Sequence, residues 1–91
     1  MAEATGLGLA LRAYAQGDFE TALAKGKPLA ENGVPAAQKL LGDMYLAGKG
    51  GLQPSESEAR AWYEKAAAGG NPYAKTALEK LDAKSGSSSP Q

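Results

Sequence analysis

Apolar residues recur along this chain with the spacing of one face of an α-helix. The clearest examples are Ala37, Leu40, Leu41, Met44 and Tyr45, and then Ala59, Trp62, Tyr63, Ala66 and Ala67. Both sets follow the i, i+3, i+4, i+7, i+8 pattern, which places their members on one side of a helix. No segment alternates apolar and polar residues with the period of two that is typical of a strand. The pattern therefore predicts an all-α protein.

Stretches that contain glycine and proline divide the helical pattern and predict where each helix ends. We expect five helices, at residues 4–16, 18–32, 35–47, 55–69 and 72–84. Asp18 and Ser55 are expected N-caps, and Glu58 would complete a capping box with Ser55. Left-handed helix ends are expected at three glycines, namely Gly33, Gly48 and Gly69.

Part of this pattern repeats within the chain. Gly33-x-Pro35-x-Ala37 recurs as Gly70-x-Pro72-x-Ala74 at an offset of 37 residues, and Tyr14-x-x-Gly17 recurs as Tyr45-x-x-Gly48 at an offset of 31. A period in the thirties that contains two helices is typical of antiparallel helix pairs stacked into an α-α superhelix, or solenoid.

A long motif also resembles a known family. Ala37-Gln38-x-x-Leu41-Gly42-x-Met44-Tyr45-x-x-Gly48-x-Gly50, followed by Ala59-x-x-Trp62-Tyr63-x-Lys65-Ala66-Ala67-x-Gly69, resembles the Sel1-like repeat, and Gly17-Asp18-Phe19-Glu20-x-Ala22 is similar to the related tetratricopeptide turn. The resemblance covers about residues 9–82 and implies a solenoid with an adaptor or regulatory role, commonly bacterial and often periplasmic or secreted. Glu79 stands where the family has glycine, which implies a polar closing helix.

Composition and charge restrict the possible functions. Ten basic residues balance ten acidic ones, so no long-range field attracts nucleic acid or anionic lipid. The chain has no cysteine and no histidine, which disfavours structural zinc and removes the commonest catalytic groups. No apolar run reaches the ~20 residues that span a bilayer. We therefore expect a protein that is not an enzyme, that binds no cofactor and no nucleic acid, and that does not insert into a membrane. We also expect it to be a monomer or a weak dimer.

Three features have competing interpretations. Trp62 and Tyr63 are expected in the core, with stacking on a ligand as the alternative. The glycine-rich loop at residues 48–51 is interpreted as a turn rather than a phosphate-binding loop, because it follows a helix. The lysines of the last helix form either a solvated edge or a surface for an acidic partner, and they are Lys75, Lys80 and Lys84.

The repeat offsets align residues across the first, third and fifth helices, which should line the concave face. One such row is Arg12, Asp43 and Lys80. A second row contains Leu9 and Leu40, a third contains Lys39, and a fourth contains Leu46. They predict a groove for a partner peptide or helix. The candidate partner-binding residues are Leu9, Arg12, Lys39, Leu40, Asp43, Leu46 and Lys80. The alternative is that the leucines pack between the helices.

We expect residues 1–84 to form the repeat domain and residues 85–91 to be a flexible polar tail. The predicted function is a protein-interaction module, with a structural fragment or capping unit of a longer repeat array as the alternative. The sequence as written carries no signal peptide and would be cytoplasmic, whereas a protein from which a signal peptide had been removed would be periplasmic or secreted; the sequence leaves both alternatives open.

Overall fold

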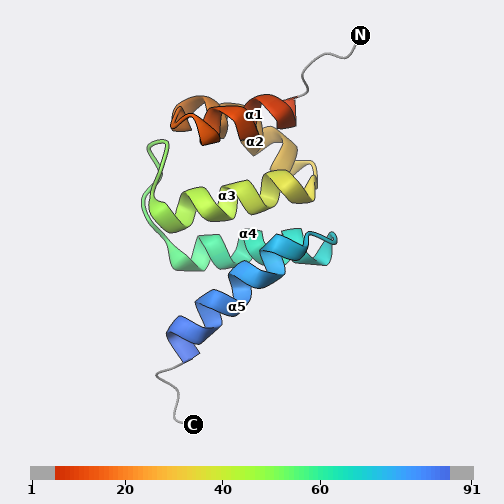
Figure 1. Cartoon of the computed structure of the whole chain (residues 1–91), viewed down its shortest axis with the longest axis vertical. Coiled ribbons are helices and arrows are strands. Elements are labelled where there is room, and N and C mark those ends of the chain that lie inside the picture. The colour runs from red at the N-terminus through yellow and green to blue at the C-terminus, as the bar shows by residue number, and fades with distance from the viewer. Residues whose placement is uncertain (1–5, 87–91) are drawn as a thin grey trace.

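The computed structural model describes residues 6–86, which form five α-helices (Figure 1). They are α1 (Gly6–Ala15), α2 (Phe19–Glu31), α3 (Pro35–Ala47), α4 (Glu56–Ala68) and α5 (Pro72–Gly86). No strand occurs among the described residues, so the all-α prediction is confirmed. Helix α5 continues two residues beyond its expected end, and the rest of the expected tail, residues 87–91, lies outside the described residues.

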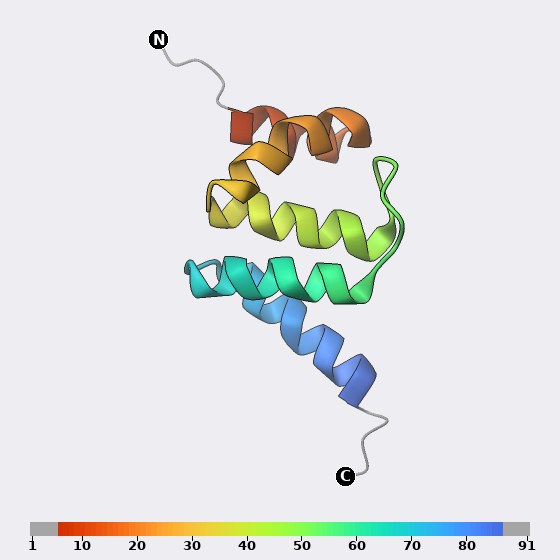
Figure 2. The ribbon, with the colours of Figure 1, turned by 180° about the vertical axis from the view of Figure 1, so that it is seen from behind.

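The helices stack in chain order as a short solenoid, with α1 against α2, α3 against α4, and α5 against α4. Helices α1 and α5 lie on the face turned to the viewer in Figure 1, and α2 and α4 lie on the face seen in Figure 2. Helices α3 and α4 run side by side, whereas α5 crosses α4 obliquely and moves away from α3 toward its end. This divergence leaves one side of α3 uncovered. None of the described helices has the length and apolar character needed to cross a membrane.

The core consists of two clusters that meet at α3 and α4. The first joins α1, α2 and α3 through Ala10, Ala13, Ala22, Ala30, Ala37, Leu40, Leu41 and Met44. The second joins α4 and α5 through Ala59, Tyr63, Ala66, Ala74 and Leu81, and Tyr45 of α3 packs against it. Alanine dominates both clusters, so the helix backbones can approach closely. Tyr63, Leu41 and Met44 are the largest fully buried side chains.

Gly42 provides the closest approach between α3 and α4. A Cβ atom at this position would lie 2.5 Å from both Cδ1 and Cε1 of Tyr63, a distance that real Cβ atoms do not tolerate. Gly42 therefore faces a neighbouring helix, and its lack of a side chain permits the close packing.

The two adjacent aromatic residues of α4 have different environments. Tyr63 is 1% exposed, which leaves no ring face on which a ligand could stack. Trp62 is only partly buried; it packs against the first cluster, and the Nζ atom of Lys65 lies 4.7 Å from its ring centroid. The core interpretation holds fully for Tyr63 and partly for Trp62.

The N-cap predictions are confirmed, but the capping box is wrong. Asp18 accepts a hydrogen bond from the Thr21 backbone N–H at 3.2 Å, and the Ser55 hydroxyl accepts one from the Glu58 N–H at 3.1 Å. The reciprocal bond of a capping box needs the Ser55 backbone N–H, which instead donates to the Tyr45 carbonyl at 2.8 Å. This bond ties the loop after α3 back to the end of that helix.

Gly33 and Gly48 are left-handed as expected, with φ of 92° and 71°. The prediction for Gly69 is wrong, because its φ is −83° and the left-handed residue is Gly70, with φ of 100°. The Gly69 N–H still continues the helical turn by donating to the Lys65 carbonyl at 3.0 Å. A Cβ at Gly69 would lie 2.7 Å from Cγ of Pro35, so close approach explains this glycine.

We predict that Gly42→Ala lowers the free energy of unfolding by about 1–3 kcal/mol, because overpacking against Tyr63 outweighs the helix propensity gained by alanine. Gly26→Ala is the matched control: both glycines are buried in helices, but the new Cβ at Gly26 meets the end of the Leu40 side chain at 3.1 Å and Cβ of Ala10 at 3.7 Å, and no aromatic ring. Urea denaturation measures the free energy of unfolding of both variants. Equal stability changes for the two variants would contradict the proposed packing.

Candidate functional site

A groove of about 410 Å³ lies between α3 and α5, where the two helices diverge. Helix α3 contributes Lys39, Asp43 and Leu46; α4 contributes Tyr63; and α5 contributes Tyr73, Thr76, Ala77, Lys80, Leu81 and Lys84. Four of the seven candidate residues therefore line one groove. Lys39, Asp43 and Leu46 come together because residues at i, i+4 and i+7 share one helix face.

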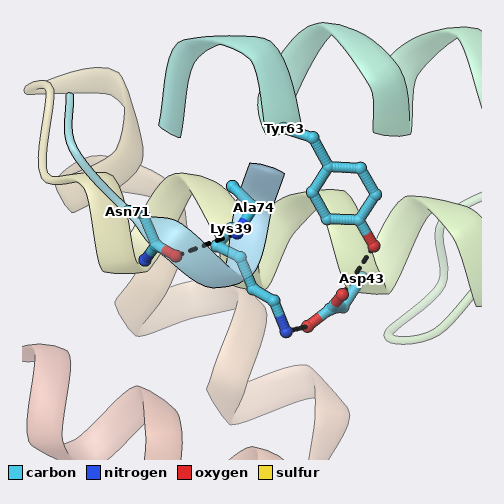
Figure 3. A network of polar contacts seen from close by, with 5 residues as sticks. All are labelled: Lys39, Asp43, Tyr63, Asn71 and Ala74. Carbon is cyan, nitrogen blue, oxygen red and sulfur yellow. Dashed lines mark hydrogen bonds and ion pairs between the residues drawn. The ribbon is translucent and has the colours of Figure 1, made fainter. Parts of the chain in front are cut away.

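A chain of polar contacts links α3 to α4 among the residues that line the groove (Figure 3). The Lys39 ammonium lies 2.7 Å from Oδ2 of Asp43, and the Tyr63 hydroxyl donates to Oδ1 of the same carboxylate at 2.5 Å. Both carboxylate oxygens are thus engaged within the protein. Asp43 therefore holds Lys39 and Tyr63 in place, and its charge is largely neutralised by Lys39.

The phenols near this carboxylate remain protonated well beyond neutral pH. Burial, followed by the hydrogen bond to Asp43, raises the pKa of Tyr63 above its ordinary range. Burial, followed by the charge of Asp43, also raises the pKa of Tyr14 on α1. The Tyr63 hydroxyl therefore keeps its proton and donates it in the hydrogen bond to the Asp43 carboxylate.

Apolar side chains remain exposed on both sides of the groove. Leu46 of α3 is 37% exposed and Tyr73 of α5 is 71% exposed, although both are large apolar or aromatic residues. Between them, Ala77 is half-buried and Leu81 is buried. The groove therefore combines an apolar base with two accessible apolar edges.

The structure places the other three candidate residues elsewhere. Leu40 is 2% exposed and belongs to the first core cluster, with its Cδ2 atom against Gly26 of α2. Leu40 follows Lys39 directly, so it points about 100° away from the groove face. For Leu40 the packing alternative is correct, and no partner can reach it. Leu9 and Arg12 lie on α1 and do not line the groove.

Six groove residues were not among the candidates, namely Tyr63, Tyr73, Thr76, Ala77, Leu81 and Lys84. A signal existed for Tyr73, because an aromatic residue stands where the repeat offset places Ala36 in α3. Lys84 follows Lys80 by four residues, which puts both on the same face of α5.

One family model matches part of the chain. Residues 35–71 match the Sel1 repeat, and this segment contains α3, the following loop, α4 and the turn before α5. Sel1 repeats generally mediate protein–protein interactions and are generally non-enzymatic. Searches of curated proteins and of solved structures gave no match.

We predict that Tyr63→Phe lowers the free energy of unfolding by about 1–2 kcal/mol, because the partly buried Asp43 loses a charged hydrogen bond while the ring packing is kept. Urea denaturation at neutral pH measures this loss. An unchanged urea midpoint in Tyr63→Phe would contradict a stabilising hydrogen bond between Tyr63 and Asp43.

The same variant tests the raised pKa of Tyr63. A tyrosine in the unfolded chain titrates near its ordinary pKa of about 10. Above that pH the unfolded state releases a proton that the folded state retains, so stability is complete below about pH 10 and falls as pH rises. We expect the alkaline fall to be shallower in Tyr63→Phe than in wild type; parallel curves would contradict the raised pKa.

Proposed function

We propose that this chain, whose α3–α4 hairpin is a Sel1 repeat, is an adaptor or regulatory module that binds a segment of another protein in the groove between α3 and α5. The observation that carries the proposal is the exposure of Leu46 and Tyr73 on opposite sides of one groove. Apolar and aromatic side chains that enter a desolvated site supply most of the energy of protein association.

Rigid support favours this function. The groove residues lie on helices, and Tyr63 and Leu81 at its base belong to the second core cluster. A preformed surface reduces the entropy lost on binding. Its volume of about 410 Å³ lies within the range of ligand-binding clefts, which are roughly 300–1,000 Å³. It can therefore receive a few side chains of a partner.

The polar groups of the groove suit binding better than catalysis. Its one carboxylate, Asp43, already accepts from Tyr63 and Lys39, and the Tyr63 phenol is held protonated. A general base must be able to take a proton from a substrate, and neither group is poised to do so.

A second role, as a unit that caps a longer repeat array, draws on one feature of α5. Glu79 is exposed and stands at the position equivalent to Gly42 of α3. The Tyr63 ring packs on the bare backbone of α3 at Gly42. A glutamate at the equivalent position of α5 would therefore hinder a further helix from packing on α5 in the same way. Glu79 does not line the groove, so this role and partner binding are compatible.

We predict that Leu46→Asp lowers partner retention at least about tenfold, because it replaces an apolar contact of roughly 1.5–3 kcal/mol with a charge. Leu11→Asp on α1 is the matched control, since Leu11 is 44% exposed and lies outside the groove. Immobilised wild type and both variants are incubated with extract of the source cells, and retained proteins are quantified by mass spectrometry.

Before immobilisation, a thermal melt monitored by circular dichroism in solution tests whether each variant is folded. The proposal predicts that wild type and Leu11→Asp retain the same proteins and that folded Leu46→Asp does not. Equal retention by Leu46→Asp and wild type would exclude the groove as the binding site.

A further inference from the structure

We propose that the partner segment bound in the α3–α5 groove is acidic, with carboxylates placed beside one or two apolar residues. This inference rests on the proposed function and adds the chemical class of the partner. It follows from the distribution of charge around the groove.

The groove is locally basic in a chain whose charges balance overall. Three lysines line it, Lys39 on α3 and Lys80 and Lys84 on α5, against one acidic residue, Asp43. Since both Asp43 oxygens are engaged by Lys39 and Tyr63, this carboxylate offsets Lys39. Lys84 pairs with Glu56, so the positive charge left in excess along the groove is that of Lys80.

Each lysine can accept a carboxylate at low cost. Lys80 is exposed and makes no ion pair with any residue that the structure describes. Lys84 lies 3.2 Å from Glu56, but both side chains are well exposed, and such surface pairs exchange readily because they contribute only about 0–1 kcal/mol. Lys39 keeps further N–H donors beyond the one directed at Asp43, because an ammonium group has three.

Charged and apolar groups alternate along the groove. Helices α3 and α5 run in the same general direction, because α3 is antiparallel to α4 and α5 turns back obliquely across α4 (Figure 1). Lys39 and Tyr73 therefore lie toward one end, and Leu46 and Lys84 toward the other. Each end of the groove therefore carries one lysine and one exposed apolar side chain, which matches a segment that contains both acidic and apolar residues.

A pure polyanion fits this surface less well. Nucleic acid would pair with the lysines but leave Leu46 and Tyr73 without an apolar partner. Binding energy at protein interfaces comes mainly from such apolar contacts, while complementary charges determine specificity and orientation. The combination therefore favours an acidic protein segment.

Two matched libraries of displayed twelve-residue peptides test the charge class. Every peptide carries two residues from Leu, Ile, Phe and Trp at varied spacing; the remaining positions are Asp, Glu, Ser or Gly in one library and Lys, Arg, Ser or Gly in the other. We expect wild type to enrich the acidic library at least tenfold over the basic one.

Charge-reversal variants then place the effect in the groove. Lys80→Glu should lower binding of the selected acidic peptides at least fivefold, measured by fluorescence anisotropy. Lys75→Glu is the matched control, because Lys75 is an exposed residue of the same helix that does not line the groove. It should bind within twofold of wild type, and Leu46→Asp should bind weakly.

Each contrary result overturns a defined part of the account. Selection of basic peptides whose binding is lost in Leu46→Asp would reject the acidic partner while supporting the groove. Failure of both libraries to give groove-dependent binders would reject the acidic segment, and the extract experiment would still decide the proposed function. Equal competition by poly-glutamate or single-stranded DNA would show that charge alone is recognised, which also contradicts the inference.

Discussion

The Tyr63 ring packed on the bare backbone of α3 at Gly42 is the contact on which the rest of the stack depends. It brings α3 and α4 together at a distance that any side chain at position 42 would prevent. The same ring is buried in the second core cluster, which also contains Ala74 and Leu81 of α5. One aromatic residue therefore links the helix pair to the last helix.

The hydroxyl of Tyr63 extends this contact from the core into the groove. It donates to Asp43, which in turn pairs with Lys39, so the position of a surface cation is determined by a buried ring. The groove exists because α5 packs on α4 and diverges from α3. A core that is rich in alanine thus gives close helix packing on one side of α3 and an open, partly apolar surface on the other.

Much of this architecture could be predicted from local sequence. Helix number, helix ends to within three residues, the Asp18 N-cap and the close approach at Gly42 all follow from periodicity and backbone chemistry. Four groove residues were also found, because the repeat offsets carry positions from one helix to the next.

The remaining features depend on how helices cross, which local patterns do not encode. Leu40 and Leu46 have equal apolar character, yet Leu40 faces Gly26 of α2 and Leu46 faces the space left by α5. The Ser55 N–H meets a carbonyl of α3 only after the loop folds back, and the shift of the left-handed turn to Gly70 follows from continued helical bonding at Gly69.

The most direct test of this account is a double-mutant cycle between Tyr63→Phe and Asp43→Ala, measured by urea denaturation at neutral pH. If the buried tyrosine holds the groove carboxylate, the two changes are coupled by about 1 kcal/mol or more, because each removes the same charged hydrogen bond. Stability losses that add to within a few tenths of a kcal/mol would show that the core and the groove are independent, and would contradict the account.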